Sequence, residues 1–170
     1  MKKLLKSLLV ISMVVLVSGC GDKKEEVQNQ GETPKQEATE KTYKCSLTSN
    51  DVVNGYKLES LYEIYAKDDV VKKVVTEEKV TSEDNAILDT FETTLNDTYK
   101  ATDEAYGGYD YEIVRSGDEL VSTTTIDYSA MDLKKYVEDN SVLKSYVNDN
   151  NELTVEGIKK LYTSLGATCD

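Results

Sequence analysis

The chain has 170 residues, a formal net charge of −12 at pH 7, and neither histidine nor tryptophan. Without an imidazole there is no serine–histidine or cysteine–histidine nucleophile and no histidine-ligated metal, so the sequence excludes these enzyme classes and cofactor sites. The acidic charge opposes contact with phosphate groups, so we expect no nucleic-acid partner.

The first twenty residues have the layout of a secretory signal. Lys2, Lys3 and Lys6 give a basic start, an apolar run covers residues 4–17, and the small residues Ser18 and Gly19 stand directly before Cys20. This order resembles the signal peptide and lipobox of bacterial lipoproteins. The resemblance implies cleavage after Gly19, a diacylglycerol on the Cys20 sulfur, and a further fatty acyl chain such as palmitate on the new amine. The expected location is the extracytoplasmic face of the cell membrane, with the lipid bilayer as a partner through acylated Cys20.

Two other interpretations of this segment stay open. The apolar run could be a transmembrane helix, although it is shorter than the ~20 residues that a bilayer span needs and contains polar Lys6, Ser7 and Ser12. It could also be an ordinary signal peptide that is cut nearby, with Cys20 incidental. Two or three acyl chains hold a protein on a membrane far longer than one chain does, so the lipoprotein interpretation predicts stable attachment without a membrane-spanning fold.

A polar segment follows the signal. Residues 21–42 are rich in Lys, Glu, Gln and Thr, contain the only proline of the chain, Pro34, and have no aromatic side chain. Such a segment cannot bury enough apolar surface to become ordered. The predicted organisation is therefore a signal peptide at 1–19, the lipidated cysteine and a disordered tether at 20–42, and one domain at 43–170. A domain of this size supports one hydrophobic core.

The first half of this domain has the pattern of β-strands. Polar and apolar residues alternate over Tyr56–Ala66, which is typical of a strand with one buried face. A short loop at 67–69 joins it to Val70–Val80, which is rich in valine and threonine, so these two strands should pair antiparallel. A shorter candidate strand covers Tyr43–Leu47 and carries Cys45.

Helical and strand signals alternate in the second half. Ser82 is a suitable N-cap for an amphipathic helix to about Thr102. A strand, a returning strand, weak helical signals and a last helix follow, and Thr154 caps that last helix while Gly166 ends it. The strand covers Tyr109–Ile113, the returning strand covers Leu120–Tyr128, and the weak helical signals cover Asp132–Asn148.

Strand pairs joined by short turns and separated by helices indicate an α+β fold. We expect an antiparallel sheet of about five strands with helices packed on one face, in the order β-β-β-α-β-β-α-α. The lipobox, the two hairpins and the segments 81–84, 125–128 and 161–169 resemble the YehR-like bacterial lipoprotein family. That family is a domain of unknown function with a small α+β fold. The resemblance implies this fold and the membrane location, and it carries no catalytic or binding residue to transfer.

Two cysteines, Cys45 and Cys169, lie near the two ends of the predicted domain. Disulfides persist in exported proteins, so these two predict one structural disulfide. The alternative is a redox or metal-binding pair, which would need a Cys-x-x-Cys spacing or a second type of ligand that the sequence lacks.

Four tyrosines, Tyr99, Tyr106, Tyr109 and Tyr111, gather around a glycine pair and are the candidate ligand-binding residues. Tyrosine rings can stack on a sugar or a peptide. The alternative is that they belong to the core, because tyrosine is the usual large residue in a chain with 12 Tyr and one Phe. Residues 148–152 are rich in side-chain oxygens but lack the spacing of a calcium loop, so we expect no metal and no other cofactor.

The sequence identifies no reaction, and we do not expect an enzyme. The favoured function is a binding or interaction module of the cell envelope, with an unidentified envelope protein or small ligand as its partner. Two alternatives stay open: a structural or assembly protein without a ligand pocket, and a hydrolase that uses two carboxylates. A pocket lined by tyrosines would favour the first function, a contiguous apolar patch the second, and a carboxylate pair in a cleft the third.

Overall fold

The computed structural model describes residues 40–170. The predicted signal peptide 1–19, the lipidation site Cys20 and the predicted tether up to residue 39 lie outside the described residues. Within 40–170, no helix is both long enough and apolar enough to cross a membrane.

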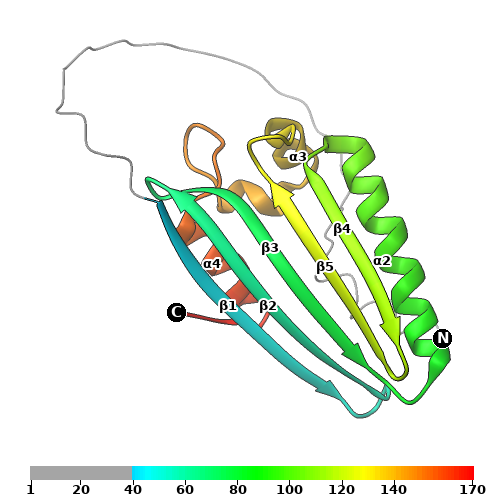
Figure 1. Cartoon of the computed structure of the whole chain (residues 1–170). Helices are drawn as coiled ribbons and strands as arrows, with labels where there is room; N and C mark the ends of the chain where they lie inside the picture. The colour runs from blue at the N-terminus through cyan, green and yellow to red at the C-terminus, as the bar shows by residue number, and fades with distance from the viewer. Residues whose placement is uncertain (1–39) are drawn as a thin grey trace, which may run out of the picture.

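Six antiparallel strands form one sheet in the order β4-β5-β3-β2-β1-β6 (Figure 1). The meander β1–β2–β3 and the hairpin β4–β5 lie side by side because β5 pairs with β3. The strands are β1 (Glu40–Asp51), β2 (Tyr56–Lys67), β3 (Val70–Thr81), β4 (Tyr109–Ser116), β5 (Glu119–Asp127) and β6 (Thr168–Cys169).

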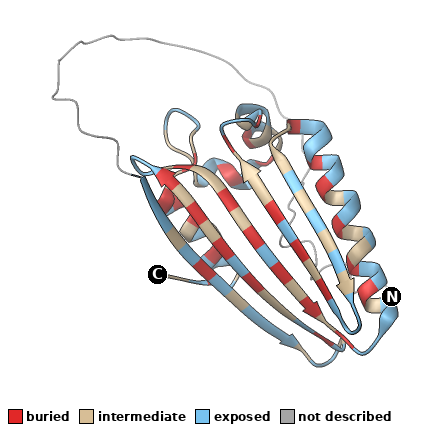
Figure 2. Ribbon diagram, in the orientation of Figure 1, coloured by how far each residue is buried: buried red, intermediate tan, exposed pale blue. Residues whose placement is uncertain are grey.

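The helices cover one face of this sheet, and no helix of 40–170 covers the other, open face (Figure 1). Burial alternates along the central strands, as expected for a sheet with one covered face (Figure 2). In β2, Ser60 and Tyr62 are buried whereas Leu61 between them is exposed. The predicted α+β class is confirmed, with six strands in place of about five. The helical elements are α2 (Asn85–Tyr106), α3 (Leu133–Asp139), the 3₁₀ helix η1 (Ser141–Ser145) and α4 (Val155–Ser164).

The two strands at the β1 edge differ most from the prediction. β1 pairs with β2 along its whole length, from Glu40 opposite Lys67 to Asp51 opposite Tyr56. The sequence does not indicate a strand of this length, because much of β1 is exposed at the edge of the sheet and its residues there are polar. β6 was not predicted, since two residues are too few to show a periodic pattern.

Helix α2 has a different N-cap from the predicted one. The Asp84 side chain accepts a hydrogen bond from the Ala86 backbone N–H at 2.9 Å. Ser82 instead donates its hydroxyl to the Gly55 carbonyl at 2.7 Å, which ties the start of the helix to the β1–β2 turn. The prediction of Ser82 as the cap was therefore wrong, whereas Thr154 caps α4 as predicted.

The covered face holds two hydrophobic clusters. One lies under α2 and includes Val80, Leu88 and Phe91. The other lies under α3 and α4 and includes Ile64 and Ile158. The helix layer thus covers the sheet in two parts, and the space over the sheet between α3 and α4 forms the candidate site described below.

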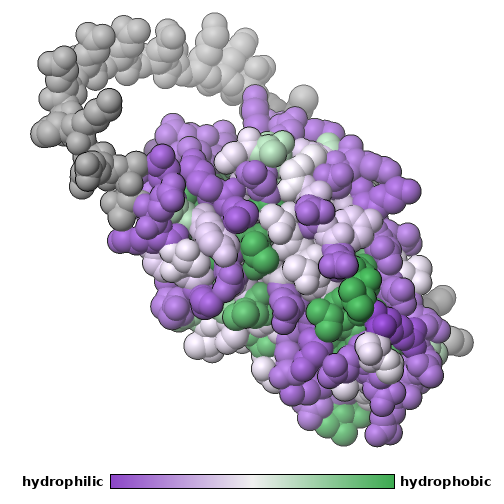
Figure 3. Space-filling view, viewed as in Figure 1, coloured by the Kyte–Doolittle hydropathy of each residue, from purple (hydrophilic) through white to green (hydrophobic). Residues whose placement is uncertain are grey.

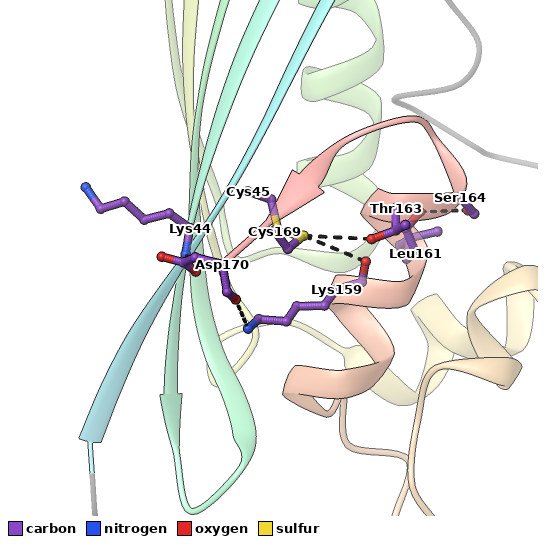
Figure 4. Close-up of a disulfide and its surroundings, with 8 residues drawn as sticks. All are labelled: Lys44, Cys45, Lys159, Leu161, Thr163, Ser164, Cys169 and Asp170. Atoms are coloured by element: carbon purple, nitrogen blue, oxygen red, sulfur yellow. Dashed lines mark hydrogen bonds between the residues drawn. A yellow bond between two sulfur atoms is a disulfide. The ribbon is translucent and has the colours of Figure 1, made fainter.

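A disulfide joins Cys45 to Cys169, as predicted (Figure 4). These two residues lie opposite each other in the β1–β6 pair. Beside them, the Lys44 N–H donates to the Asp170 carboxylate at 2.8 Å, and the Asp170 N–H donates to the Lys44 carbonyl at 3.1 Å. Lys159 of α4 donates its ammonium group to the Asp170 carbonyl. These contacts fix the C-terminus between edge strand β1 and helix α4.

Candidate ligand-binding site

A cavity of about 130 Å³ lies between α4 and the α3–η1 segment, over the covered face of the sheet. Most of its lining is apolar, and aliphatic side chains come from β5, η1 and α4, among them Ile126, Val142 and Ile158. Concave shape, apolar walls and a few polar groups are the usual features of small-molecule sites, and this volume limits an occupant to the size of one ring. The aromatic part of the lining consists of Tyr62, Tyr109, Tyr128, Tyr136 and Tyr162.

Separate parts of the chain supply these five tyrosines. The alternation of β2 places Tyr62 on the covered face of the sheet. The helical period places Tyr162 on the buried face of α4, where its ring stacks on Tyr62 with centroids 4.1 Å apart and planes at 20°. This stacked pair joins α4 to the middle of the sheet and forms one wall of the cavity.

A glycine pair positions two more of the tyrosines. Gly107 and Gly108 have φ values of 68° and 76°, a conformation that favours glycine. A Cβ at Gly108 would lie 2.6 Å from the Asp127 carbonyl oxygen, and the Gly108 carbonyl accepts the Asp127 N–H at 2.8 Å. This close approach aligns the ends of β4 and β5, so that the next residues, Tyr109 and Tyr128, both reach the cavity.

Of the four tyrosines predicted as ligand-binding residues, Tyr109 lines the cavity. Tyr99 and Tyr111 belong to the core on the α2 side, where the Tyr99 ring lies 6.3 Å from Tyr109 and 5.4 Å from Tyr111. Tyr106 packs edge-on against Tyr136, with centroids 5.0 Å apart. The predicted tyrosines are therefore neighbours in space, but Tyr99, Tyr106 and Tyr111 are not part of the cavity wall.

The other four cavity tyrosines, Tyr62, Tyr128, Tyr136 and Tyr162, were not predicted as ligand-binding residues. Strand alternation and helical spacing mark Tyr62 and Tyr162 as buried, but neither pattern shows that the two rings meet. That contact depends on how α4 returns to the sheet, which the β1–β6 pair and the disulfide determine over long range.

Two tyrosines in the cavity wall are largely buried, and their hydroxyls have no hydrogen-bond partner within 40–170. Tyr128 and Tyr162 are each 9% exposed, and neither hydroxyl makes a hydrogen bond to another residue of 40–170. Burial, reinforced by nearby tyrosine hydroxyls, raises the pKa of both well above the ordinary tyrosine value, and burial raises the pKa of Tyr62 to about 12. Buried polar groups are normally hydrogen-bonded, so these uncharged hydroxyls are suited to meet a ligand or a water molecule.

Asn140 adds a buried amide to the same wall. It is 3% exposed, and its Nδ2 donates to the Tyr136 carbonyl at 2.8 Å. Its Oδ1 has no hydrogen-bond partner among the described residues. The polar part of the cavity therefore consists of hydroxyl and amide groups and contains no charged side chain of 40–170.

Glu78 of β3 is buried near the cavity but is not in its lining. In the strand register it lies between Ser60 of β2 and Ser122 of β5. The Tyr99 hydroxyl donates to Glu78 Oε2 at 3.2 Å, while Oε1 has no partner within 40–170. Burial raises the pKa of Glu78 to about 7, although the bond from Tyr99 acts in the opposite direction. Glu78 is the only charged residue in the buried core of the described chain.

Side-chain oxygens of the loop 148–152 accept hydrogen bonds from the backbone of the same loop. Asn148 Oδ1 accepts the backbone N–H groups of Asn150 at 2.9 Å and Glu152 at 3.0 Å. Across the described residues, no group of three or more Cys, Asp or Glu side chains is placed to hold a metal ion. The structure therefore assigns this loop to the turn before α4.

No protein-family model and no curated protein matches the chain. Solved structures with a similar fold include the NMR structure of the E. coli YehR protein, which is 18% identical, with a TM-score of 0.52 over 79% of this chain and 93% of that chain. An NMR structure of a protein from Streptococcus pneumoniae TIGR4 is 21% identical, with a TM-score of 0.45 over 89% of this chain and 100% of that chain. At these identities a likeness concerns the fold alone, and the likeness to the E. coli protein supports a YehR-like fold for this chain.

Proposed function

We propose that the chain is a lipoprotein of the cell envelope, anchored through acylated Cys20 on the extracytoplasmic face of the membrane, and that its domain is a binding module for a small ligand. The observation that carries the binding part is the cavity between α3–η1 and α4, with its five tyrosine rings and its unpartnered hydroxyls. The basic, apolar and small-residue order that ends at Cys20 supports the anchor. In this proposal the lipid bilayer holds the protein, the small molecule is its ligand, and neither nucleic acid nor a cofactor takes part.

Replacing Cys20 by serine tests the anchor. Cys20→Ser removes the sulfur that would carry the diacylglycerol, and the anchor depends on two or three acyl chains for long residence. We expect loss of the mature lipidated form, with the variant either released or retained as an uncleaved precursor. Membrane fractionation together with intact mass would show this. Lipidation at Cys20 would be ruled out if the Cys20→Ser protein stays on the membrane and has the mass of the wild type apart from the substitution itself.

A pair of valine variants tests the cavity. Val142 lies in the cavity wall and is 38% exposed, so a tryptophan at this position can fill the cavity without being forced into the core. Val114, which is 52% exposed on the open face of the sheet, takes the same substitution as the matched control. In a ligand-detected NMR screen of neutral single-ring compounds, compounds should bind the wild type and Val114→Trp but bind Val142→Trp at least tenfold more weakly. Absence of any bound compound, or equal binding by all three proteins, would contradict the binding function.

The open face of the sheet gives the assembly alternative some support. Leu61 is 40% and Val114 is 52% exposed there, and Val52 and Val53 at the β1–β2 turn are 80% and 95% exposed. Figure 3 shows the apolar groups on this face as separate patches between hydrophilic residues. Assembly interfaces usually present a contiguous apolar patch, so the cavity is the stronger observation. The hydrolase alternative gains no support from the cavity, because no carboxylate of 40–170 lines it.

A further inference from the structure

We propose that the cavity binds a phenol, meaning a neutral single aromatic ring with a hydroxyl group, either as a free molecule or as the tyrosine side chain of a peptide. This inference rests on the proposed binding function and specifies the chemical class of the ligand. It follows from the volume of the cavity, from walls without a charged side chain of 40–170, and from tyrosine hydroxyls that have no hydrogen-bond partner within 40–170.

The volume of the cavity limits the ligand to one ring. The space is about 130 Å³. An apolar cavity of roughly 150 Å³ in another protein is known to take up benzene, so a six-membered aromatic ring is the appropriate size. The rings of Tyr62 and Tyr162, which stack on each other, and the side chain of Tyr109 supply aromatic surface for such a ring.

The walls select a neutral and mostly apolar ligand. No charged side chain of the described chain lines the cavity, and the tyrosine hydroxyls are uncharged at neutral pH because their ordinary pKa is near 10 and burial raises it further. A carboxylate or ammonium group placed here would lose its water without gaining a partner of opposite charge. A sugar ring would face a similar problem, because most of its hydroxyls would point at Ile126, Ile158 and the other aliphatic side chains.

The unpartnered groups select one hydroxyl on that ring. Tyr128 and Tyr162 are nine-tenths buried, line the cavity, and make no hydrogen bond to any residue of 40–170. Their hydroxyls are close enough for that of Tyr162 to raise the pKa of Tyr128. Asn140 Oδ1 in the same wall also has no partner in this part of the chain. A phenol hydroxyl can both donate and accept, so it can satisfy groups that an unsubstituted ring would leave unpaired.

The test compares p-cresol with toluene, which differ only in the hydroxyl, on the full-length protein in detergent. Dissociation constants come from amide chemical-shift titrations of the ¹⁵N-labelled wild type, the double variant Tyr128→Phe/Tyr162→Phe, and the control Tyr111→Phe, whose ring lies outside the cavity. The wild type and the control should bind p-cresol about tenfold more tightly than toluene, the effect of one hydrogen bond. The double variant should lower this ratio to about one while its affinity for toluene stays within about twofold of the wild type.

The double variant should also fold normally, because it removes two hydroxyls that have no partner and keeps both rings; its melting temperature without ligand checks this.

Equal binding of p-cresol and toluene by the wild type, or an unchanged ratio in the double variant, would overturn the phenol assignment and leave the binding function in place. If only N-acetyl-tyrosinamide binds among phenols, the assignment holds for a peptide tyrosine. If the wild type binds no phenol but another compound binds and is lost in Val142→Trp, the class is wrong and the site is right. If no compound binds, both proposals fail.

Discussion

Replacing Cys45 and Cys169 together by serine is expected to lower the free energy of unfolding by about 4–5 kcal/mol, the value that the chain-entropy model gives for a loop of this length. The disulfide closes a segment with a sequence separation of 124. The bond also holds β6, which pairs with β1 at only two positions and is otherwise tied by the hydrogen bonds of Lys44 and Lys159 to Asp170. Urea denaturation of the oxidised wild type and the double serine variant measures the loss.

The reduced wild type is the control for this experiment, since it has both cysteines but no bond. It should unfold at the same urea concentration as the double serine variant, and both well below the oxidised protein. Intact mass of the exported protein before and after reductant shows whether the bond forms. Free thiols at Cys45 and Cys169 in the exported protein, or equal stability of the oxidised and reduced forms, would exclude the bond as a structural staple.

Replacing Glu78 by glutamine is expected to change how stability depends on pH. Burial raises the pKa of Glu78 from 4.5 to about 7 in the folded protein. Below about pH 4.5 the carboxyl is protonated in both the folded and the unfolded state, so it does not make stability depend on pH there. Between these values the folded state keeps a proton that the unfolded state releases, so stability falls as pH rises, and above about pH 7 the loss levels off at about 3 kcal/mol.

The variant lacks this titration, so its stability relative to the wild type should rise by up to about 3 kcal/mol between pH 4.5 and pH 8. The titratable groups that interact with Glu78 are Tyr99 from α2, Tyr62 from β2 and Tyr162 from α4, and none of them titrates in this range because burial raises the pKa of each. Glu77→Gln, at the exposed neighbouring position, is the matched control and should shift stability by less than about 0.5 kcal/mol at either pH. A difference between Glu78→Gln and wild type that stays the same at both pH values would show that Glu78 is ionised in the folded state.

The elements with a clear period are the ones that sequence reasoning places well. The alternation of Tyr56–Lys67 and Val70–Thr81 fixes both the strands and their buried faces. Thr154 and Gly166 mark the ends of α4, because a side-chain cap and a positive φ of 97° have local residue preferences. Local sequence therefore determines most of this α+β fold.

The features that the sequence does not reveal depend on contacts between distant segments. β1 extends to Glu40 because β2 offers a partner along its whole length, although its own residues are mostly polar. The N-cap moves from Ser82 to Asp84 because Ser82 bonds to Gly55 in a turn far away in the chain. Both outcomes follow from tertiary hydrogen bonds that override local preference.

The candidate site is the least predictable part for the same reason. The glycine pair drew attention to Tyr109, which lines the cavity, because the backbone conformation of the pair is local. The other tyrosines of the cavity come from β2, α3, α4 and the end of β5, and only the folded chain brings them together. A count of tyrosines in a chain without tryptophan indicates aromatic surface but cannot show which rings leave a space between them.

Intermolecular nuclear Overhauser effects between p-cresol and the full-length protein provide the most direct test of a ligand site in this cavity. The cavity site predicts contacts from the p-cresol ring protons to the ring protons of Tyr62 and Tyr162 and to the methyl groups of Ile158, all of which line the cavity. These contacts should disappear in Val142→Trp and persist in Val114→Trp. Contacts that appear instead at the methyl groups of Leu61 and Val114 on the open face of the sheet, or no contacts at a saturating concentration, would contradict it.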